Sequence, residues 1–214
     1  MQLLDILVKG GYLMIPIYLA SIVALYIFVE RILALRKVQI NTRTFVLQVR
    51  NLLLRNEMED AIVLCKKTAG PISRMTRIGI ENLNRPRLEI KEAIDSVGKA
   101  EIYNLEKNLG ALGTIASVAP MLGFFGTVTG MITAFMQIQS HGGNVDASVL
   151  AGGIWEALLT TAAGLAVGII SLIAYNYVQG KIEKIVFEME EVSTELMSSI
   201  LNETGAGRRE FANQ

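Results

Sequence analysis

Residues 147–180 read ASVLAGGIWEALLTTAAGLAVGIISLIAYNYVQG, and Glu156 is the only charged residue among them. Residues 110–141, GALGTIASVAPMLGFFGTVTGMITAFMQIQSH, contain no charged residue, and neither do residues 10–29. An α-helix needs about 20 apolar residues to cross a bilayer, so each block is long enough to form a span. Lipid-exposed strands are excluded because their unpaired backbone groups would face hydrocarbon. The sequence therefore predicts an all-α integral membrane protein with three transmembrane helices.

The three blocks lack the polar face that a surface helix of a soluble protein carries. A soluble protein with a buried helical core is the alternative, and it fits blocks that are apolar all round less well. Blocks 110–141 and 147–180 exceed the roughly 20 residues that the hydrocarbon core requires. We therefore expect spans two and three to tilt or to extend into the cytoplasm as long helices.

The positions of Lys and Arg predict the orientation. Fourteen of the twenty lie at 35–109, and none lies at 139–150. Because loops rich in Lys and Arg stay on the cytoplasmic side, the N-terminus is predicted outside and the C-terminus inside. The expected segments are a periplasmic interfacial segment at 1–9, transmembrane helices at 10–34, 110–138 and 149–178, a cytoplasmic helical region at 35–109, a short periplasmic loop at 139–148, and a cytoplasmic C-terminal helix and tail at 179–214.

The region between spans one and two is expected to be a small set of helices. Apolar residues recur there at helical spacing, and turn residues at Gly70–Pro71 and 84–86 divide the pattern. The expected helices are 42–54, 56–67, 72–83, 87–109 and, after span three, 181–201. The fourth is predicted to lead directly into span two, because no breaker stronger than Gly110 separates them.

Glu156 stands alone in its span. A carboxylate at the bilayer centre costs about 2.5–3.5 kcal/mol on insertion scales, so such a residue normally faces protein interior or a water-filled path. Low dielectric disfavours the charged form. We therefore expect Glu156 to take and release a proton near neutral pH. The alternative is a structural carboxyl group that is hydrogen-bonded between helices, and proton handling is the favoured interpretation.

Small and hydroxyl-bearing residues accompany Glu156. Thr160 lies four residues further on and therefore on the same helix face. Gly164 and Gly168 have the small-xxx-small spacing that permits close helix packing. Span two carries a similar series of glycines, namely Gly123, Gly126 and Gly130. Ordinary membrane packing is the simplest interpretation of these glycines.

Several common functional motifs are absent from the sequence: GxxxxGK[ST], HExxH and GxSxG. His141, the only histidine, is expected to be a solvated loop residue, and Cys65, the only cysteine, a packed structural thiol. The basic residues are interleaved with acidic ones, which argues against a nucleic-acid surface. We therefore expect no cofactor, no metal, no nucleic-acid partner and no enzymatic activity.

Two stretches resemble the MotA/TolQ/ExbB proton channel family. They are LGTIASVAPMLGFFGTVTGMITAF at 112–135 and GGIWEALLTTAAGLAVGIISLIAYN at 152–176, and the pair Glu30–Arg31 at the end of span one is a weaker match. The order of the spans, the large inner segment and the short second outer loop also fit. Three spans rather than four make ExbB/TolQ the closer branch, and nothing here separates ExbB from TolQ.

The resemblance implies a proton-driven motor in the bacterial inner membrane. Its members form homo-oligomers, as pentamers, around two single-span ExbD/TolR-like subunits, and energise a TonB- or TolA-like protein that acts at the outer membrane. By position, Glu156 matches the family's third-span glutamate, and Thr127 and Thr161 match its hydroxyl residues. Helical spacing instead favours Thr160 as the neighbour of Glu156, so all four are candidates for the proton pathway.

A non-conducting oligomeric membrane scaffold is the main alternative function. A scaffold would explain the small-residue helices and the inner bundle, but it would not explain a lone Glu156 flanked by threonines. An intramembrane enzyme is a third alternative, for which no nucleophile–base set is visible. Among these alternatives, the sequence favours the ExbB/TolQ-like channel subunit surrounded by lipid.

Overall fold

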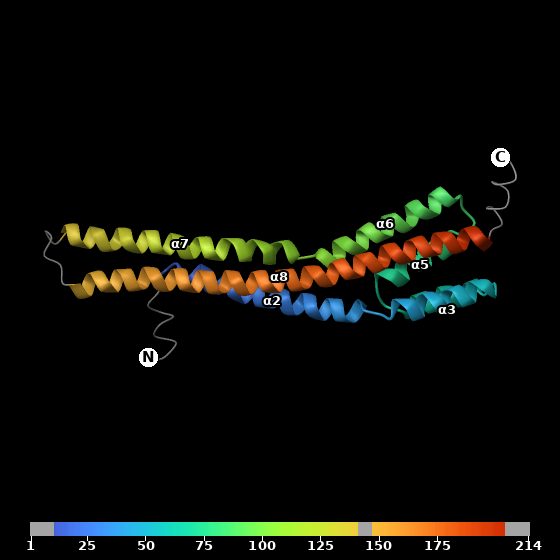
Figure 1. Ribbon diagram of the computed structural model, residues 1–214, viewed down its shortest axis with the longest axis horizontal. Helices are drawn as coiled ribbons and strands as arrows, with labels where there is room; N and C mark the ends of the chain where they lie inside the picture. The colour runs from blue at the N-terminus through green and yellow to red at the C-terminus, as the bar shows by residue number, and fades with distance from the viewer. Residues whose placement is uncertain (1–10, 141–146, 204–214) are drawn as a thin grey trace. The chain divides into compact units, whose positions relative to one another are not determined.

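The structure is a computed structural model that describes residues 11–140 and 147–203, which are helical apart from short connections (Figure 1). The expected segment at 1–9, most of the expected loop at 139–148, His141 and the end of the expected C-terminal tail lie outside the described residues. The helices are α2 (Met14–Val38), α3 (Thr42–Leu54), α4 (Met58–Lys67), α5 (Pro71–Glu81), α6 (Arg87–Glu106), α7 (Leu109–Ser140) and α8 (Ala147–Glu203).

The chain divides into two compact units. We call Met1–Arg31 with Asn108–Val178 the apolar unit, and Ile32–Lys107 with Gln179–Gln214 the charged unit. The helices α2 and α8 contribute residues to both units, and α8 is one uninterrupted helix of 57 residues. The apolar unit holds most of the uncharged sequence, so it is the part that can enter a bilayer.

Three stretches contain helix that is long and apolar enough to cross a membrane: Met14–Leu54, Arg87–Ser140 and Ala151–Ser198. Their most apolar windows are only 22%, 22% and 28% buried. A helix in the core of a soluble protein would bury such a window against its neighbours. This exposed apolar surface is compatible with helices that face lipid. The prediction of an all-α protein with three helices able to cross a membrane is therefore confirmed.

Within the apolar unit, α2 packs against α8. The rings of Phe28 and Tyr177 meet edge to face with centroids 6.4 Å apart. Near the end of the unit's first segment, the Arg31 guanidinium is buried and forms an ion pair with its neighbour Glu30, with Nε donating to Oε2 at 2.6 Å. Because each charge is met by the other, the pair can occupy a poorly solvated position at the end of an apolar helix.

The charged unit has a core of its own, made by α3, α4, α5, α6 and the last turns of α8. Its buried apolar side chains include Phe45, Val49, Ile72, Met75, Ile90, Ile94, Ile182, Met189 and Leu196. Thr42 at the start of α3 donates a hydrogen bond of 2.6 Å to Glu188 of α8. The helical spacing of these apolar positions explains why helices as short as α4 and α5, which are too small to be stable alone, form here.

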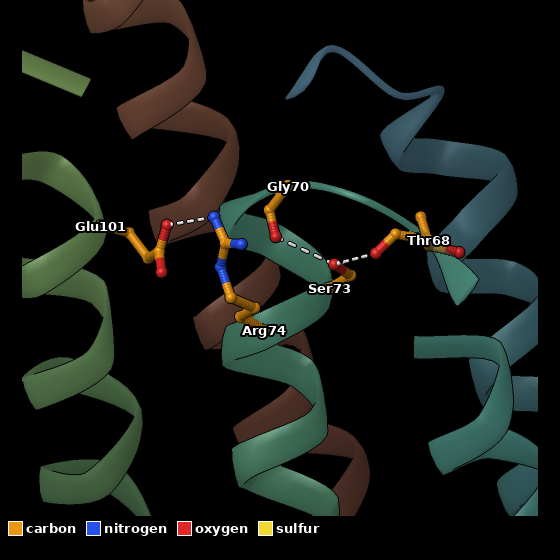
Figure 2. Close-up of polar contacts among 5 residues, drawn as sticks. All are labelled: Thr68, Gly70, Ser73, Arg74 and Glu101. Carbon is orange, nitrogen blue, oxygen red and sulfur yellow. Dashed lines mark hydrogen bonds and ion pairs between the residues drawn. The ribbon is translucent and has the colours of Figure 1, made fainter. Parts of the chain in front are cut away.

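The start of α5 shows how a predicted break is built (Figure 2). Gly70 precedes the helix with φ of 123°, and Pro71 occupies the first turn, where it has no N–H to leave unsatisfied. The Ser73 hydroxyl lies 2.6 Å from the carbonyl of Thr68 and 2.9 Å from that of Gly70. The backbone conformation of Gly70, the position of Pro71 and the hydrogen bonds of Ser73 together end the preceding segment and start α5.

Beside that turn, an ion pair joins α5 to α6. Arg74 on α5 donates to the largely buried carboxylate of Glu101 on α6 at 2.6 Å (Figure 2). The same two helices also pack closely, since a Cβ on Gly98 would lie 3.3 Å from the terminal methyl of Met75. The ion pair therefore crosses the interface between α5 and α6, where apolar side chains are also in contact.

Two expected helix bounds were wrong because an asparagine takes a left-handed conformation, and the helix expected at 72–83 is α5, which runs from Pro71 to Glu81. The predicted helix 87–109 ends at Glu106, and Asn108 with φ of 63° separates it from α7. Likewise, the helix expected from Asn56 starts at Met58, because Asn56 has φ of 62°. Asparagine tolerates this region better than other residues with a side chain. The helix 42–54 was predicted with the bounds that α3 has.

Candidate functional site

The helices α7 and α8 lie side by side and antiparallel, in contact through glycine (Figure 1). A Cβ on Gly123 would lie 3.1 Å from the Cα atoms of Gly164 and Thr161, so the two backbones touch. One turn further along α7, Gly126 faces the Thr160 side chain, and after another turn Gly130 faces Ala157. Close approach of this kind needs residues without a side chain.

Gly168 makes the corresponding contact at the other end of this series. It faces the ring of Pro120, and its Cβ position is 3.1 Å from the backbone carbonyl of Ala116. Proline has no N–H, so this carbonyl lacks its usual helical donor. The glycine on α8 lets the other helix approach at the point where α7 carries its proline.

Glu156 lines a cavity of about 280 Å³ formed by α7, α8 and the three residues just before α2, Gly11, Tyr12 and Leu13. Hydroxyl groups share this cavity, from Thr129 and Thr133 on α7 and from the buried Thr160 on α8. The amide of Gln137 lines it as well. The cavity thus brings a carboxyl group together with groups that can bind water, within the apolar unit.

The chain before α2 covers part of this carboxyl group. Gly11 has φ of 71°, and a Cβ there would lie 3.0 Å from Cδ of Glu156 and closer still to one carboxylate oxygen. A side chain at position 11 would therefore be strained by the backbone and would collide with Glu156. Gly11 is the residue that allows the segment to pass over the carboxyl group.

Thr127 and Thr161 form a separate pair, one on α7 and one on α8. Their hydroxyl groups are hydrogen-bonded to each other. Thr161 also donates to the backbone carbonyl of Gly123 at 2.8 Å. The pair joins the two helices at the level of Gly123, where their backbones touch.

The structure therefore separates the predicted pathway residues into two groups. Thr160 shares the cavity with Glu156, and its hydroxyl donates to the Glu156 backbone carbonyl at 2.9 Å, while Thr127 and Thr161 pair with each other. The predicted packing glycines Gly123, Gly126, Gly130, Gly164 and Gly168 all lie between α7 and α8.

Thr133 and Gln137, which line the Glu156 cavity, were not among the predicted site residues. The signal that would have found them is spacing, because Thr129, Thr133 and Gln137 are four residues apart and fall on one face of α7. Gly11 was not predicted either, because its role depends on backbone conformation.

A second, larger cavity of about 540 Å³ lies between α2 and α8. It is lined almost entirely by apolar side chains, with Ser21, Ser171 and Tyr177 as the polar exceptions, and no carboxyl group reaches it. Because no carboxylate, histidine or cationic side chain among the described residues lines this apolar groove, the Glu156 cavity is the candidate site despite its smaller size.

Within the described ranges, no cluster of His, Cys, Asp or Glu is arranged to hold a metal ion. Cys65 is buried on α4, as predicted for a packed thiol. Burial raises the pKa of Cys65 from its ordinary value of 9.0 to about 11, against a smaller lowering by Arg77. The thiol is therefore protonated at neutral pH and unsuited to act as a nucleophile.

Comparison with known proteins relates the chain to ion-conducting membrane proteins. The profile of the MotA/TolQ/ExbB proton channel family matches residues 67–191, which include all of α7 and Glu156. A Methanothermobacter thermautotrophicus protein named a biopolymer transport protein ExbB homolog is 33% identical over 177 residues, which cover 81% of this chain and 62% of the relative. The chain thus spans less than two thirds of that relative's length.

Two further relatives represent both named branches. A Synechocystis protein named ExbB-like 1 is 32% identical over 82% of this chain and 70% of its own length. The Tol-Pal system protein TolQ of Haemophilus influenzae is 38% identical over 104 residues, which cover 47% of this chain and 45% of the relative. Taken with three apolar helices and a carboxyl group in a polar cavity among them, these matches show that the chain is a multi-pass membrane protein of the MotA/TolQ/ExbB proton channel family.

Proposed function

We propose that this chain is the channel-forming subunit of an ExbB/TolQ-like motor complex, which uses the proton motive force to energise a TonB- or TolA-like protein. The membership in a proton channel family supports the general role. The observation that carries the proposal for this chain is the position of Glu156, a carboxyl group on an apolar helix that lines a cavity with hydroxyl groups.

The proposed topology places the protein in the inner membrane with its N-terminus in the periplasm. Residues 35–109 and 179–214, which make up nearly all of the charged unit, would then lie in the cytoplasm. The distribution of Lys and Arg supports this orientation, because 35–109 holds fourteen of the twenty and 139–150 holds none. The helices α6 and α8 would extend from the membrane into the cytoplasm on this topology.

In the proposed mechanism, Glu156 is the residue that binds and releases the transported proton. A carboxylate on a lipid-facing surface is costly, so the exposed Glu156 of a single chain needs protein or water beside it. A partner helix that alternately covers and uncovers the cavity would couple protonation to movement. Thr160 would hold water beside the carboxyl group, and the Thr127–Thr161 pair would continue the route.

The proposed assembly is a homo-oligomer, a pentamer by resemblance, that encloses two single-span ExbD/TolR-like subunits. Large apolar side chains remain exposed on the single chain, including Phe124, Phe135 and Ile173. Part of this surface faces lipid, and the remainder is available for other copies and for the partner helices. The exposed position of Glu156 agrees with a carboxyl group that meets its partner from another subunit.

Proton uptake by proteoliposomes that contain the complex with its single-span partner tests the proposal. We expect Glu156→Gln to insert and to bind the partner normally but to lower gradient-driven uptake to that of protein-free vesicles, because the amide keeps the shape and removes the proton-binding group. Glu156→Asp titrates but is shorter, so it should retain part of the activity.

The matched control is Glu190→Gln, an exposed glutamate further along α8 in the charged unit. It makes the same chemical change in the same helix, and its uptake should equal that of the unaltered protein. Full uptake by an assembled Glu156→Gln complex would instead leave Glu156 with a structural role and favour the non-conducting scaffold.

A further inference from the structure

The Glu156 cavity extends along the α7–α8 interface in one direction only. It begins at Gly126 and Thr160 and continues to Gln137 and Gly152. The contacts of the two helices order these positions, because Gly126 faces Thr160, Gly130 faces Ala157, and Ala134 faces Gly153. Beyond Gly126 the backbones of Gly123 and Gly164 touch. In this conformation the cavity therefore leads from Glu156 toward the end of α7 and the start of α8.

Polar residues follow this direction on α7. Thr129, Thr133 and Gln137 recur every four residues, so they stand above one another on one helix face, about 6 Å apart along the axis. All three line the cavity that contains Glu156. The next side chains on other faces, Phe135 and Met136, are 60% and 64% exposed and apolar. Phe135 and Met136 do not line the cavity, whereas the three polar residues do.

The hydroxyl groups in this row have their protons engaged by their own helix. Thr133 donates to the carbonyl of Thr129 at 2.9 Å, and Thr129 donates to those of Phe125 and Gly126 at 3.1 and 3.2 Å. A hydroxyl that donates to the backbone presents its oxygen lone pairs to its surroundings. Together with the carboxyl group of Glu156, these oxygens face the cavity as acceptors, which suits a hydrated cation rather than an anion.

We infer that Thr129, Thr133 and Gln137 form an access lane by which a hydrated proton reaches Glu156 from the end of the bundle where α7 ends and α8 begins. This inference rests on the proposed function of Glu156, which already has the proton enter from this side, and it adds the residues that guide the proton. The Thr127–Thr161 pair lies on the other side of Glu156 along the helices, at the closed end of the cavity. The lane is therefore a route separate from that pair.

Cysteine accessibility tests the lane without relying on transport. In a Cys65→Ala background, which removes the only native thiol, single cysteines replace Thr133 or Gln137 in the assembled complex in membranes. The probes are two membrane-impermeant methanethiosulfonates, one with a trimethylammonium group and one with a sulfonate. Phe135→Cys and Met136→Cys are the matched controls, because they lie between the two test positions in the sequence and outside the cavity.

We expect the cationic probe to modify Thr133→Cys and Gln137→Cys at least tenfold faster than the controls, and to be preferred over the anionic probe. Adding Glu156→Gln should reduce that preference, since the carboxylate supplies the negative charge. Equal rates at test and control positions would overturn the lane, as would a charge preference that Glu156→Gln leaves unchanged. These outcomes do not depend on conduction, so they are distinct from a failure of the proposed proton channel.

Proton uptake provides a second measurement. Thr133→Val keeps the shape of the side chain and removes its oxygen, and it should lower uptake by roughly five- to tenfold, as expected for the loss of one hydrogen bond to the ion's water. Thr114→Val is the matched control, because Thr114 also donates to its own helix, at 2.9 Å to Gly110, but lies outside the cavity. Equal uptake by the two variants would remove Thr133 from the route.

Discussion

The hydroxyl groups of Thr127 and Thr161 are hydrogen-bonded across the α7–α8 interface. A hydroxyl group has one proton, and Thr161 uses its proton in the 2.8 Å bond to the carbonyl of Gly123. Thr127 is therefore the donor to Thr161, since its own contact with that carbonyl is a long 3.4 Å. The result is a directed chain from Thr127 through Thr161 to the backbone. Reversing it requires both hydroxyl groups to rotate, which is the behaviour of a short proton relay.

The first prediction concerns this chain of hydroxyl groups. Thr161→Val removes the middle member and leaves the Gly123 carbonyl without its second donor, whereas Thr127→Val removes only the first. We expect Thr161→Val to lower proton uptake more than Thr127→Val, and the double variant to be no worse than Thr161→Val. The measurement is uptake by proteoliposomes that contain the complete complex.

The corresponding control on α8 is Thr194→Val, because the Thr194 hydroxyl also bonds to its own helix, at 3.0 Å to Glu190, but far along the chain from the site. It should leave uptake unchanged. Strictly additive losses from the two site variants would show that Thr127 and Thr161 act independently rather than as one chain.

The second prediction concerns the packing of α7 on α8. A Cβ on Gly164 would lie 2.6 Å from the carbonyl of Ala119 and 2.8 Å from Cα of Gly123, which are backbone atoms that cannot move aside. Gly164→Ala should therefore force the helices apart and cost about 1–3 kcal/mol, as overpacking does. Thermal unfolding of the purified complex in mild detergent measures the loss.

Gly180→Ala is the matched control on the same helix, because a Cβ there meets nothing within 4 Å. Alanine favours a helix by about 1 kcal/mol over glycine, so this variant should be as stable as the unaltered protein or more so. If Gly164→Ala were equally well tolerated, the close contact between the two backbones would have no part in stability.

Much of the fold could be predicted because it depends on periodic and compositional signals. Three long apolar blocks with no polar face gave the three helices that can cross a membrane, and α3 follows from apolar residues at helical spacing. The buried position of Cys65 follows from its apolar neighbours in the sequence. These features require no knowledge of which helix packs on which.

The features that the sequence did not predict depend on single backbone conformations or on the neighbouring helix. Asn108 ends the long predicted helix by a left-handed conformation, and nothing in the helical pattern signals this choice. Thr160 and Thr161 are neighbours in sequence, yet one shares a cavity with Glu156 and the other bonds to Thr127. Their separation depends on where α7 lies against α8.

The third prediction concerns orientation. In a Cys65→Ala background, an impermeant maleimide added to intact cells should label Gln139→Cys, at the end of α7, and should not label Asn84→Cys, in the turn between α5 and α6. Both positions are exposed, so a difference in labelling reports the side of the membrane. Permeabilised cells should label both. Labelling of Asn84→Cys alone in intact cells would reverse the proposed topology.

The last prediction concerns Cys65 and alkaline pH. Burial raises the pKa of the Cys65 thiol to about 11 in the folded protein, whereas the thiol keeps its ordinary pKa of 9.0 in the unfolded chain. Between these two pH values the folded protein retains the thiol proton and the unfolded chain has lost it. Proton binding by the folded state alone makes the free energy of unfolding fall as pH rises from about 9 to 11. Below pH 9 both states keep the proton, so no effect is expected there. Lysine and tyrosine residues also titrate in this range, so the informative quantity is the difference between the unaltered protein and Cys65→Ala. The free energy of unfolding is measured in detergent from pH 8 to 11. Over this range the unaltered protein should lose at most about 2–3 kcal/mol more stability than Cys65→Ala does. A difference that stays constant with pH would mean that Cys65 reaches solvent in the folded protein, and its thiol would then react with iodoacetamide at pH 8 without denaturation.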